Sequence, residues 1–316
     1  MYKIALVFLY ITYTTFSFAQ TNKLQKDTSF TLSTTFIKEQ KKRPFITIAV
    51  PKANSKVLIQ KDIAFRTIND RSLLLDIYYP KRTHKLKPAV LLIFGGGWRS
   101  GDKSQNEAMS IELANRGYVA VSAEYRLSGE AQYPAAVYDI KAAIKWIKVN
   151  AATYGIDTNR ISALGVSAGG QLAALIGTTN NNPKFEDTIR VGQGHFTTNI
   201  HSAIDIDGIL AFHHPESAES LVASQWLGGT YEQCSNRWKE ASALEHITNQ
   251  IVPFLFVNSS LPRFHAGRTD FIKKLDSLHI YSEVHTFDDT PHPFWFFNPW
   301  FEPLMNYVDE FLKRVN

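Results

Sequence analysis

The chain has 316 residues, of which 44% are hydrophobic and 13% aromatic, so it can bury one large core and is not expected to be disordered. Its net charge is +5, but the 34 Lys and Arg residues are scattered among 29 acidic residues rather than gathered into one block. This distribution argues against nucleic acid as a partner, and it leaves an anionic small molecule or polysaccharide as the better expectation.

The N-terminus has the pattern of an export signal. Lys3 precedes a mostly apolar run from Ile4 to Phe18, and Ser17 and Ala19 supply small residues where signal peptidase cleaves. A membrane anchor is the alternative, but the run is short for a span and four hydroxyl residues interrupt it. We therefore predict a signal peptide over 1–19, a periplasmic or secreted protein, and no stable membrane insertion after cleavage.

A single folded domain is expected after the signal. Residues 20–45 are rich in Thr, Ser and Lys with little periodicity, which predicts a flexible N-terminal leader before a domain over 46–316. No internal repeat or linker divides that domain. Cys234 is the only cysteine, so no disulfide can form within the chain. No Cys/His spacing is typical of a metal site, and none is predicted.

The domain is predicted to open with an antiparallel pair of strands over Val57–Arg66 and Leu73–Tyr79. Strands are then expected at 89–94, 118–123, 160–164, 201–211, 251–257 and 281–287, and helices at 107–115, 134–150, 171–176, 217–246, 267–278 and 300–315. Strands that alternate with helices in this way predict an α/β fold with a mostly parallel central sheet, helices on both faces and a small helical cover.

A G-x-S-x-G pattern joins an expected strand to an expected helix, in Gly165-Val166-Ser167-Ala168-Gly169. Glycines on either side of the serine allow a turn so sharp that the Ser167 hydroxyl is exposed. The helix that follows directs its N-terminal N–H groups at a developing negative charge. A cluster of Gly and Ser is also common in ordinary turns, so the pattern needs partners elsewhere in the chain.

Three glycines, residues 95–97, follow the expected strand Ala89–Phe94. Acyl transfer requires backbone donors close to the substrate carbonyl, and a Cβ atom would prevent that approach. We assign the N–H groups of Gly96 and Gly97, together with that of Ala168, to an oxyanion hole.

The best candidate for the general base is His292. It follows the last expected strand and is flanked by Pro291 and Pro293, which would fix the backbone, and by aromatic residues that would wall a pocket. The chain order of nucleophile first and histidine last is that of serine hydrolases with the elbow motif. We predict that His292 takes the proton of Ser167.

From about residue 57 to the C-terminus, the chain resembles the esterase branch of the α/β-hydrolases, especially the bacterial feruloyl- and acetyl-esterase-like enzymes near the hormone-sensitive-lipase group. The segments that carry the resemblance are Phe94–Trp98, Ser100–Lys103, Tyr125–Leu127, Tyr154–Asp157, Gly165–Gly170 and Ala241–Leu244. The resemblance implies an α/β-hydrolase fold and hydrolysis of carboxylic esters, often acetyl or feruloyl groups on plant cell-wall polysaccharides such as xylan or pectin. It also implies an exported enzyme that needs no cofactor.

Two departures from the family pattern stand out. Phe94 occupies the position before the three glycines where related enzymes usually have His, and we expect altered packing with retained activity. The family usually places the triad Asp in the loop after the strand equivalent to Ile251–Val257, but here Asn258–Arg263 contains no carboxylate. Either another strand supplies the acid, or His292 works without one.

Four carboxylates remain as candidates for that acid. Asp207 lies nearest the end of the strand expected at 201–211, so we favour it, followed by Asp205, Asp289 and Glu283. A carboxylate in a buried strand costs several kcal/mol unless it is paired or hydrogen-bonded, which makes an orienting role plausible. The alternative is that Asp205 and Asp207 form local hydrogen bonds before Gly208.

Candidate substrate-binding residues lie close to the vacant acid position. Arg263, His265 and Arg268 could hold a uronate carboxylate, or the guanidinium groups could pair with Asp270 or solvent. Aromatic residues such as Trp98 and Trp295 could stack on sugar rings or aromatic acyl groups, although such clusters are also ordinary core.

The sequence therefore predicts an exported serine carboxylesterase that acts on an ester-substituted oligo- or polysaccharide. A peptidase or amidase on the same fold is one alternative. A catalytically inactive glycan-binding protein is another, because of the missing acid.

Overall fold

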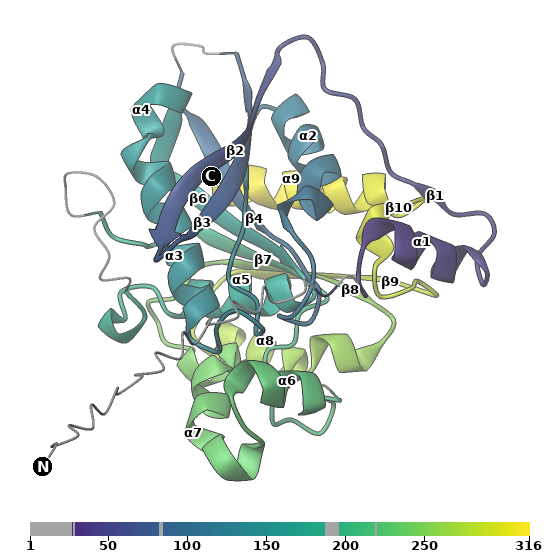
Figure 1. The fold of residues 1–316 in the computed structure, drawn as a ribbon, viewed down its shortest axis with the longest axis vertical. Helices are drawn as coiled ribbons and strands as arrows, with labels where there is room; N and C mark the ends of the chain where they lie inside the picture. Colours follow the sequence, from purple (N-terminus) through teal and green to yellow (C-terminus); the bar gives the residue numbers. More distant parts are fainter. Residues whose placement is uncertain (1–26, 28, 82–84, 187–195, 219) are drawn as a thin grey trace, which may run out of the picture.

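The computed structural model describes residues 27, 29–81, 85–186, 196–218 and 220–316, and the expected signal peptide lies outside these residues. Eight strands form one sheet in the order β2-β3-β5-β4-β6-β7-β8-β9 (Figure 1). Their bounds are β2 Val57–Ile68, β3 Arg71–Pro80, β4 Lys87–Ile93, β5 Val119–Ala123, β6 Ile156–Val166, β7 Ser202–Ile206, β8 Phe254–Ser259 and β9 Ser282–Phe287. β2, β3 and β5 pair antiparallel, and all pairs from β5 to β9 are parallel, which confirms the mostly parallel sheet.

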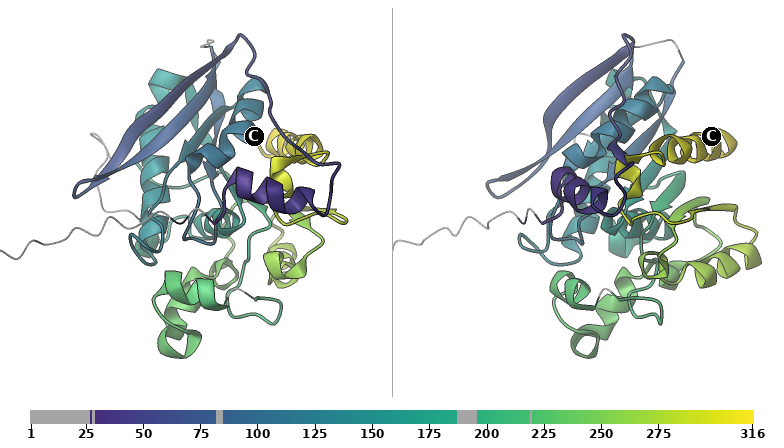
Figure 2. Two further views of the ribbon diagram at one scale, coloured as in Figure 1. Left: turned by 45° about the vertical axis from the view of Figure 1, so that its right-hand side comes forward. Right: turned by 90° about the vertical axis from the view of Figure 1, so that its right-hand side faces the viewer.

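Helices cover both faces of this sheet (Figure 2). Their bounds are α1 Leu32–Gln40, α2 Glu107–Asn115, α3 Ala135–Val149, α4 Ala151–Tyr154, α5 Ala168–Thr178, α6 Ser220–Leu227, α7 Tyr231–Ala241, α8 Arg268–Ser277 and α9 Phe301–Val315. Successive residues of β4 belong to two separate cores: Leu91 lies in the cluster with α3 and α5, whereas Leu92 lies in the cluster with α2 and α9. This burial on both faces explains why β4 is a continuous apolar run.

The expected helical cover is formed by α6 and α7, which lie together at one end of the molecule (Figure 1). Trp226 of α6 and Trp238 of α7 are both buried in the core that also contains α5. The cover is thus fixed to the domain by large aromatic side chains.

The segment over 20–45, which the sequence predicts to be a flexible leader, contains a helix in the part that the structure describes. Residues Leu32–Gln40 form α1, which begins at a capping box made by Thr31 and Thr34. Leu32 and Phe36, four residues apart, pack against the core that contains α9. The short strand β1, Thr47–Ile48, then pairs with β10, Phe297–Asn298. Tertiary contacts to the end of the chain stabilise a segment whose own periodicity is weak.

Within the described ranges, no helix combines the length and apolar character needed to cross a bilayer.

Candidate active site

Ser167 occupies a sharp turn between β6, which ends at Val166, and α5, which begins at Ala168. Its backbone angles, φ +55° and ψ −121°, are those of a strained elbow. The Ser167 N–H donates a hydrogen bond of 2.8 Å to the Ile206 carbonyl, which ties the elbow to β7. A Cβ atom on Gly169 would lie 2.1 Å from the Ile93 carbonyl oxygen, so only glycine allows α5 to pack this close to β4.

Three side chains from separate parts of the chain form one hydrogen-bonded series. His292 Nε2 lies 2.8 Å from Ser167 Oγ, and His292 Nδ1 lies 2.9 Å from Asp207 Oδ2. The imidazole stacks face to face on Phe264, with ring centroids 3.4 Å apart, and Trp295 meets its edge. A hydroxyl, a base and a carboxylate that orients the base are the groups required for nucleophilic acyl transfer.

Asp207 reaches His292 because β7 ends one residue before it. The strand expected over 201–211 stops at Ile206, where Asp207 adopts φ +52° and turns the chain. Its carboxylate is fully buried, and Oδ1 accepts hydrogen bonds from the Ser259 N–H at 2.8 Å and from the Asn258 amide at 3.4 Å. These donors at the end of β8 compensate for the loss of water around the charge.

The other three carboxylates that the sequence leaves open make different contacts. Asp205 is buried in β7, its Oδ1 accepts from the Gly208 N–H at 2.7 Å, and burial raises the pKa of Asp205 well above its ordinary value. The Asp289 side chain is 97% exposed. Glu283 forms an ion pair of 2.7 Å with an arginine of α9. Of these candidates, Asp207 is the one that bonds to His292.

The loop of three glycines lies beside Ser167. Gly96 has φ +127°, and its carbonyl accepts hydrogen bonds from the Ser100 hydroxyl at 2.9 Å and from the Ser100 N–H at 3.1 Å. Because a trans peptide unit places C=O and N–H on opposite sides, the Gly97 N–H points away from Ser100. Gly96 and Gly97 line a cavity with Ser167, as expected for an oxyanion hole, and Ala168 begins α5 next to them.

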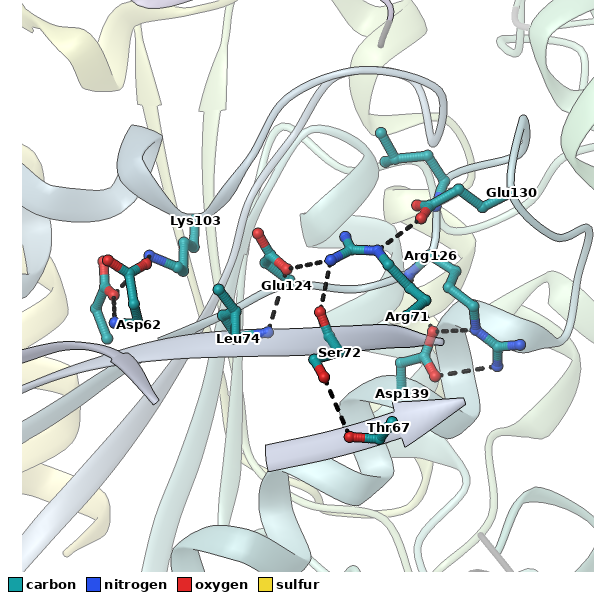
Figure 3. Close-up of polar contacts among 12 residues, drawn as sticks. Asp62, Thr67, Arg71, Ser72, Leu74, Lys103, Glu124, Arg126, Glu130 and Asp139 are labelled. Atoms are coloured by element: carbon teal, nitrogen blue, oxygen red, sulfur yellow. Dashed lines mark hydrogen bonds and ion pairs between the residues drawn. The ribbon is translucent and has the colours of Figure 1, made fainter. Parts of the chain in front are cut away.

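Phe94 supports this loop by packing. Its ring stacks on that of Tyr125 with centroids 4.3 Å apart, and the Tyr125 hydroxyl donates to the Phe94 carbonyl at 3.0 Å. The next residue, Arg126, holds Asp139 of α3 with two guanidinium nitrogens at 2.8 and 3.0 Å (Figure 3). A phenylalanine in place of the usual histidine therefore keeps the oxyanion loop anchored to the core.

Two cavities meet at Ser167. The larger, of about 710 Å³, is lined by the nucleophile, His292 and the glycine loop, and on another side by α1. The smaller, of about 30 Å³, lies among Trp98, Ile209 and Phe264 next to Ser167. An ester bound with its carbonyl at Ser167 can thus extend a small group into one cavity and a large group into the other.

The substrate-binding residues expected from the sequence fall into two groups. Arg263 lines the larger cavity, with its guanidinium carbon 4.1 Å from the centre of the Phe264 ring, and Trp98 lines the smaller one. The described residues that line these two cavities do not include His265, Arg268 or Trp295.

Those three side chains pack around the catalytic residues without lining either cavity. Arg268 donates to Asn258 Oδ1 at 2.7 Å, so its guanidinium positions the amide that holds Asp207 rather than a substrate. His265 and Trp295 are buried, and desolvation lowers the pKa of His265. Of the two alternatives that the sequence left open for these arginines, a uronate shared by both is the less favoured, because Arg263 lines the cavity whereas Arg268 bonds to Asn258.

Sequence reasoning passed over several residues of the site. Asn258 begins the segment where the family pattern has the acid, and the structure places it near the C-terminal end of β8, so its position was a usable signal. Phe264 lies in the short 3₁₀ helix Pro262–His265 that follows β8, and it carries no motif. The wall formed by α1 had a local signal in Thr31 and Thr34, the capping residues that precede an i, i+4 pair of apolar side chains.

Residues 75–261, more than half of the chain, match the BD-FAE family. The chain belongs to that family. Two curated relatives are esterase LipC of Mycobacterium tuberculosis, 31% identical over 200 residues, and an arylesterase of Saccharolobus solfataricus, 35% identical over 154 residues. The matches cover 61% and 48% of this chain and 49% of each relative, so the chain spans about half the length of these proteins.

Solved structures extend the similarity to the whole fold. An esterase of Thermogutta terrifontis with bound propionate superposes with a TM-score of 0.66 and 25% identity, covering 83% of this chain and 95% of that one. A truncated carbohydrate esterase from gut microbiota gives a TM-score of 0.63 at 21% identity, covering 81% and 96%, and indicates the fold alone. The BD-FAE chain thus has the α/β-hydrolase fold, which it shares with these esterases.

Proposed function

We propose that the protein is an exported serine carboxylesterase that removes acetyl groups from plant cell-wall polysaccharides such as xylan or pectin. The observation that carries the proposal is the series Ser167–His292–Asp207, joined by contacts of 2.8 and 2.9 Å at the meeting point of two cavities of unequal size.

The geometry supports a two-step acyl transfer. His292 takes the proton of Ser167 as the hydroxyl attacks the ester carbonyl, and Asp207 stabilises the imidazolium that forms. The N–H groups of Gly96, Gly97 and Ala168 stabilise the oxyanion. His292 then donates its proton to the departing alcohol, and a water molecule, activated by the same base, releases the acid.

The smaller cavity favours acetyl over feruloyl. Its volume of about 30 Å³, bounded by the buried side chains of Trp98 and Ile209, has room for a group the size of a methyl. An aromatic acyl group could not enter without displacing these side chains, which would cost about 1–3 kcal/mol in a packed core. The larger cavity, of about 710 Å³, is within the usual range for binding sites and suits a sugar-sized alcohol.

Export is supported by the first 19 residues, which combine Lys3, an apolar run and small residues at the expected cleavage site.

A chain-length series tests the proposal. We expect kcat/KM to fall from p-nitrophenyl acetate to the butyrate ester by about tenfold or more, and acetate to be released from acetylated xylan or pectin. The Ser167→Ala variant should be folded and inactive on all of them. If it retains activity, or if a fluorophosphonate probe fails to label Ser167 in the parent protein, the protein is not the proposed serine esterase. Preference for aminoacyl amides over esters would favour a peptidase instead.

A further inference from the structure

The N-terminal helix α1 forms one wall of the catalytic cavity. The cavity-lining residues of α1 and the turn after it recur in pairs at helical spacing, Thr34 and Thr35, Lys38 and Glu39, Lys42 and Arg43. One face of this segment is therefore turned towards Ser167 and His292 across the cavity. Figure 2 shows α1 beside the C-terminal segment that carries β10. The strand β1, which follows α1, pairs with β10 and so holds α1 at this position.

The cavity that this wall bounds is lined mainly by positive charges. Among the described residues that line the cavity, five are cationic and Glu39 is the one carboxylate. Arg43 pairs with Glu39 at 3.3 Å and with Asp289 at 3.1 Å, and Arg99 pairs with Asp27 at 3.1 Å.

The two lysines of the wall differ from these arginines. Lys38 and Lys42 are exposed to the cavity, and neither makes a side-chain hydrogen bond or ion pair with any residue that the structure describes. Two positive charges of the cavity thus have no protein counter-charge in the described chain.

The helix dipole does not account for this arrangement. Cations are favourable at the C-terminal end of a helix, but that effect does not depend on which face they occupy. Lys41, at the same end of α1, does not line the cavity, whereas Lys38 and Lys42 both do. Lys38 belongs to α1 and Lys42 to the turn after it, and both place a positive charge at the same cavity, so their ammonium groups repel each other. An anion bound between them would remove that repulsion.

We propose that Lys38, Lys42 and Arg263 bind a carboxylate on the alcohol part of the ester, so that the substrate is an acetylated carbohydrate containing uronic acid. This inference rests on the proposed esterase function. The ammonium groups act as point charges, and the Arg263 guanidinium, which lies over the Phe264 ring, offers planar donors that match a carboxylate. Phe264 also stacks on His292, so the bound carboxylate lies close to the ester that is cleaved.

A matched pair of substrates tests this assignment: an acetylated methyl galacturonoside and the neutral methyl ester of the same sugar. We expect the acidic substrate to have a kcat/KM about tenfold higher at low salt, and the preference to decrease at high salt because the cations are exposed. The double variant Lys38→Gln/Lys42→Gln should raise KM for the acidic substrate with little change in kcat, because binding to a remote group is lost equally from ground state and transition state.

Two controls complete the design. Lys41→Gln removes a charge from the same segment off the cavity, and it should leave both substrates unaffected. Circular dichroism and thermal unfolding of the double variant show that it is folded, since neither measurement depends on substrate binding.

The outcomes separate the two proposals. If the parent enzyme hydrolyses p-nitrophenyl acetate but treats the two sugar esters alike, or if the double variant loses activity equally on both, the uronate site is wrong and the esterase function stands. If the parent enzyme hydrolyses none of the three substrates, the esterase function itself fails.

Discussion

Asn258 donates its side-chain amide to Asp207 at 3.4 Å across the ends of β7 and β8, and its own oxygen accepts from Arg268 at 2.7 Å. The acid thus comes from the end of β7, and the end of β8, beside the loop where the family pattern has the acid, carries an amide that holds it. Adjacent parallel strands end at the same edge of the sheet, so a carboxylate on either one can reach the same histidine. The triad is complete although its acid lies on the neighbouring strand.

This relationship predicts unequal effects at the two positions. Asp207→Asn removes the charge that stabilises the imidazolium and should lower kcat by about 10³–10⁴-fold. Asn258→Ala removes one of the donors to that carboxylate, worth at most about 1.5–3 kcal/mol, and should lower kcat by no more than about 100-fold. Steady-state hydrolysis of p-nitrophenyl acetate measures both, with circular dichroism to check folding. A loss for Asp207→Asn no larger than that for Asn258→Ala would show that the acid is elsewhere.

The oxyanion loop predicts a sharp sensitivity to a single methyl group. A Cβ atom on Gly96 would lie 2.3 Å from the Ser100 carbonyl oxygen, and the backbone there has a positive φ. Gly96→Ala should therefore displace the loop and reduce kcat by about 10²–10³-fold, the range for loss of an oxyanion donor. Gly129→Ala is the control, because nothing lies within 4 Å of a Cβ at that position. Comparable activities of the two variants would contradict the assignment.

The small cavity predicts which residue limits the acyl chain. Ile209→Ala enlarges the pocket beside Ser167, and the kcat/KM for the butyrate ester relative to acetate should rise about tenfold, since each buried methylene contributes about 0.8 kcal/mol. Leu210→Ala removes a neighbouring buried side chain that does not line this pocket and should leave the ratio unchanged. A ratio that does not respond to Ile209→Ala would place the acyl group in the larger cavity.

Buried Asp205 predicts a pH-dependent stability. Burial raises the pKa of its carboxyl in the folded protein. Below about pH 4 both folded and unfolded states are protonated and there is no penalty. As the pH rises, the unfolded chain ionises first, and the free energy of unfolding falls by up to about 1.4 kcal/mol per pH unit until the folded pKa is reached.

Asp205→Asn should remove that decrease, because an amide oxygen can still accept from the Gly208 N–H. Urea unfolding at about pH 4 and at about pH 7 measures the difference. We expect the variant to be more stable than the parent at the higher pH only. Asp70→Asn, in an exposed turn, is the matched control, and an equal effect of both substitutions would exclude Asp205 as the cause.

Local pattern was sufficient for much of the fold and site. The elbow around Ser167 and the glycine loop depend on short segments whose backbone demands glycine, so their sequence carries the information. Helix α2 was predicted over 107–115, the range that the structure shows, because its boundaries coincide with local composition. The position of Asp207 at a strand end was enough to favour it over three other carboxylates.

Long-range contacts determine what local pattern could not predict. Helix α1 depends on packing against the aromatic segment around Phe297, which lies some 260 residues further along the chain. The roles of Arg263 and Arg268 could not be separated, because their spacing does not indicate which one faces the cavity. Trp295 was expected to contact substrate, yet its indole is buried behind the histidine that it supports.

The pairing of β1 with β10 has a consequence for the order of folding. Thr47 and Asn298, bonded across this pair, are 251 residues apart, and closing such a loop in an unfolded chain costs about 5 kcal/mol. A two-residue ladder cannot offset that cost, so it forms only after the large sheet has brought β10 near. Mild denaturant should therefore release α1 before the sheet melts, and discrimination between acidic and neutral sugars should be lost while simple acetates are still cleaved.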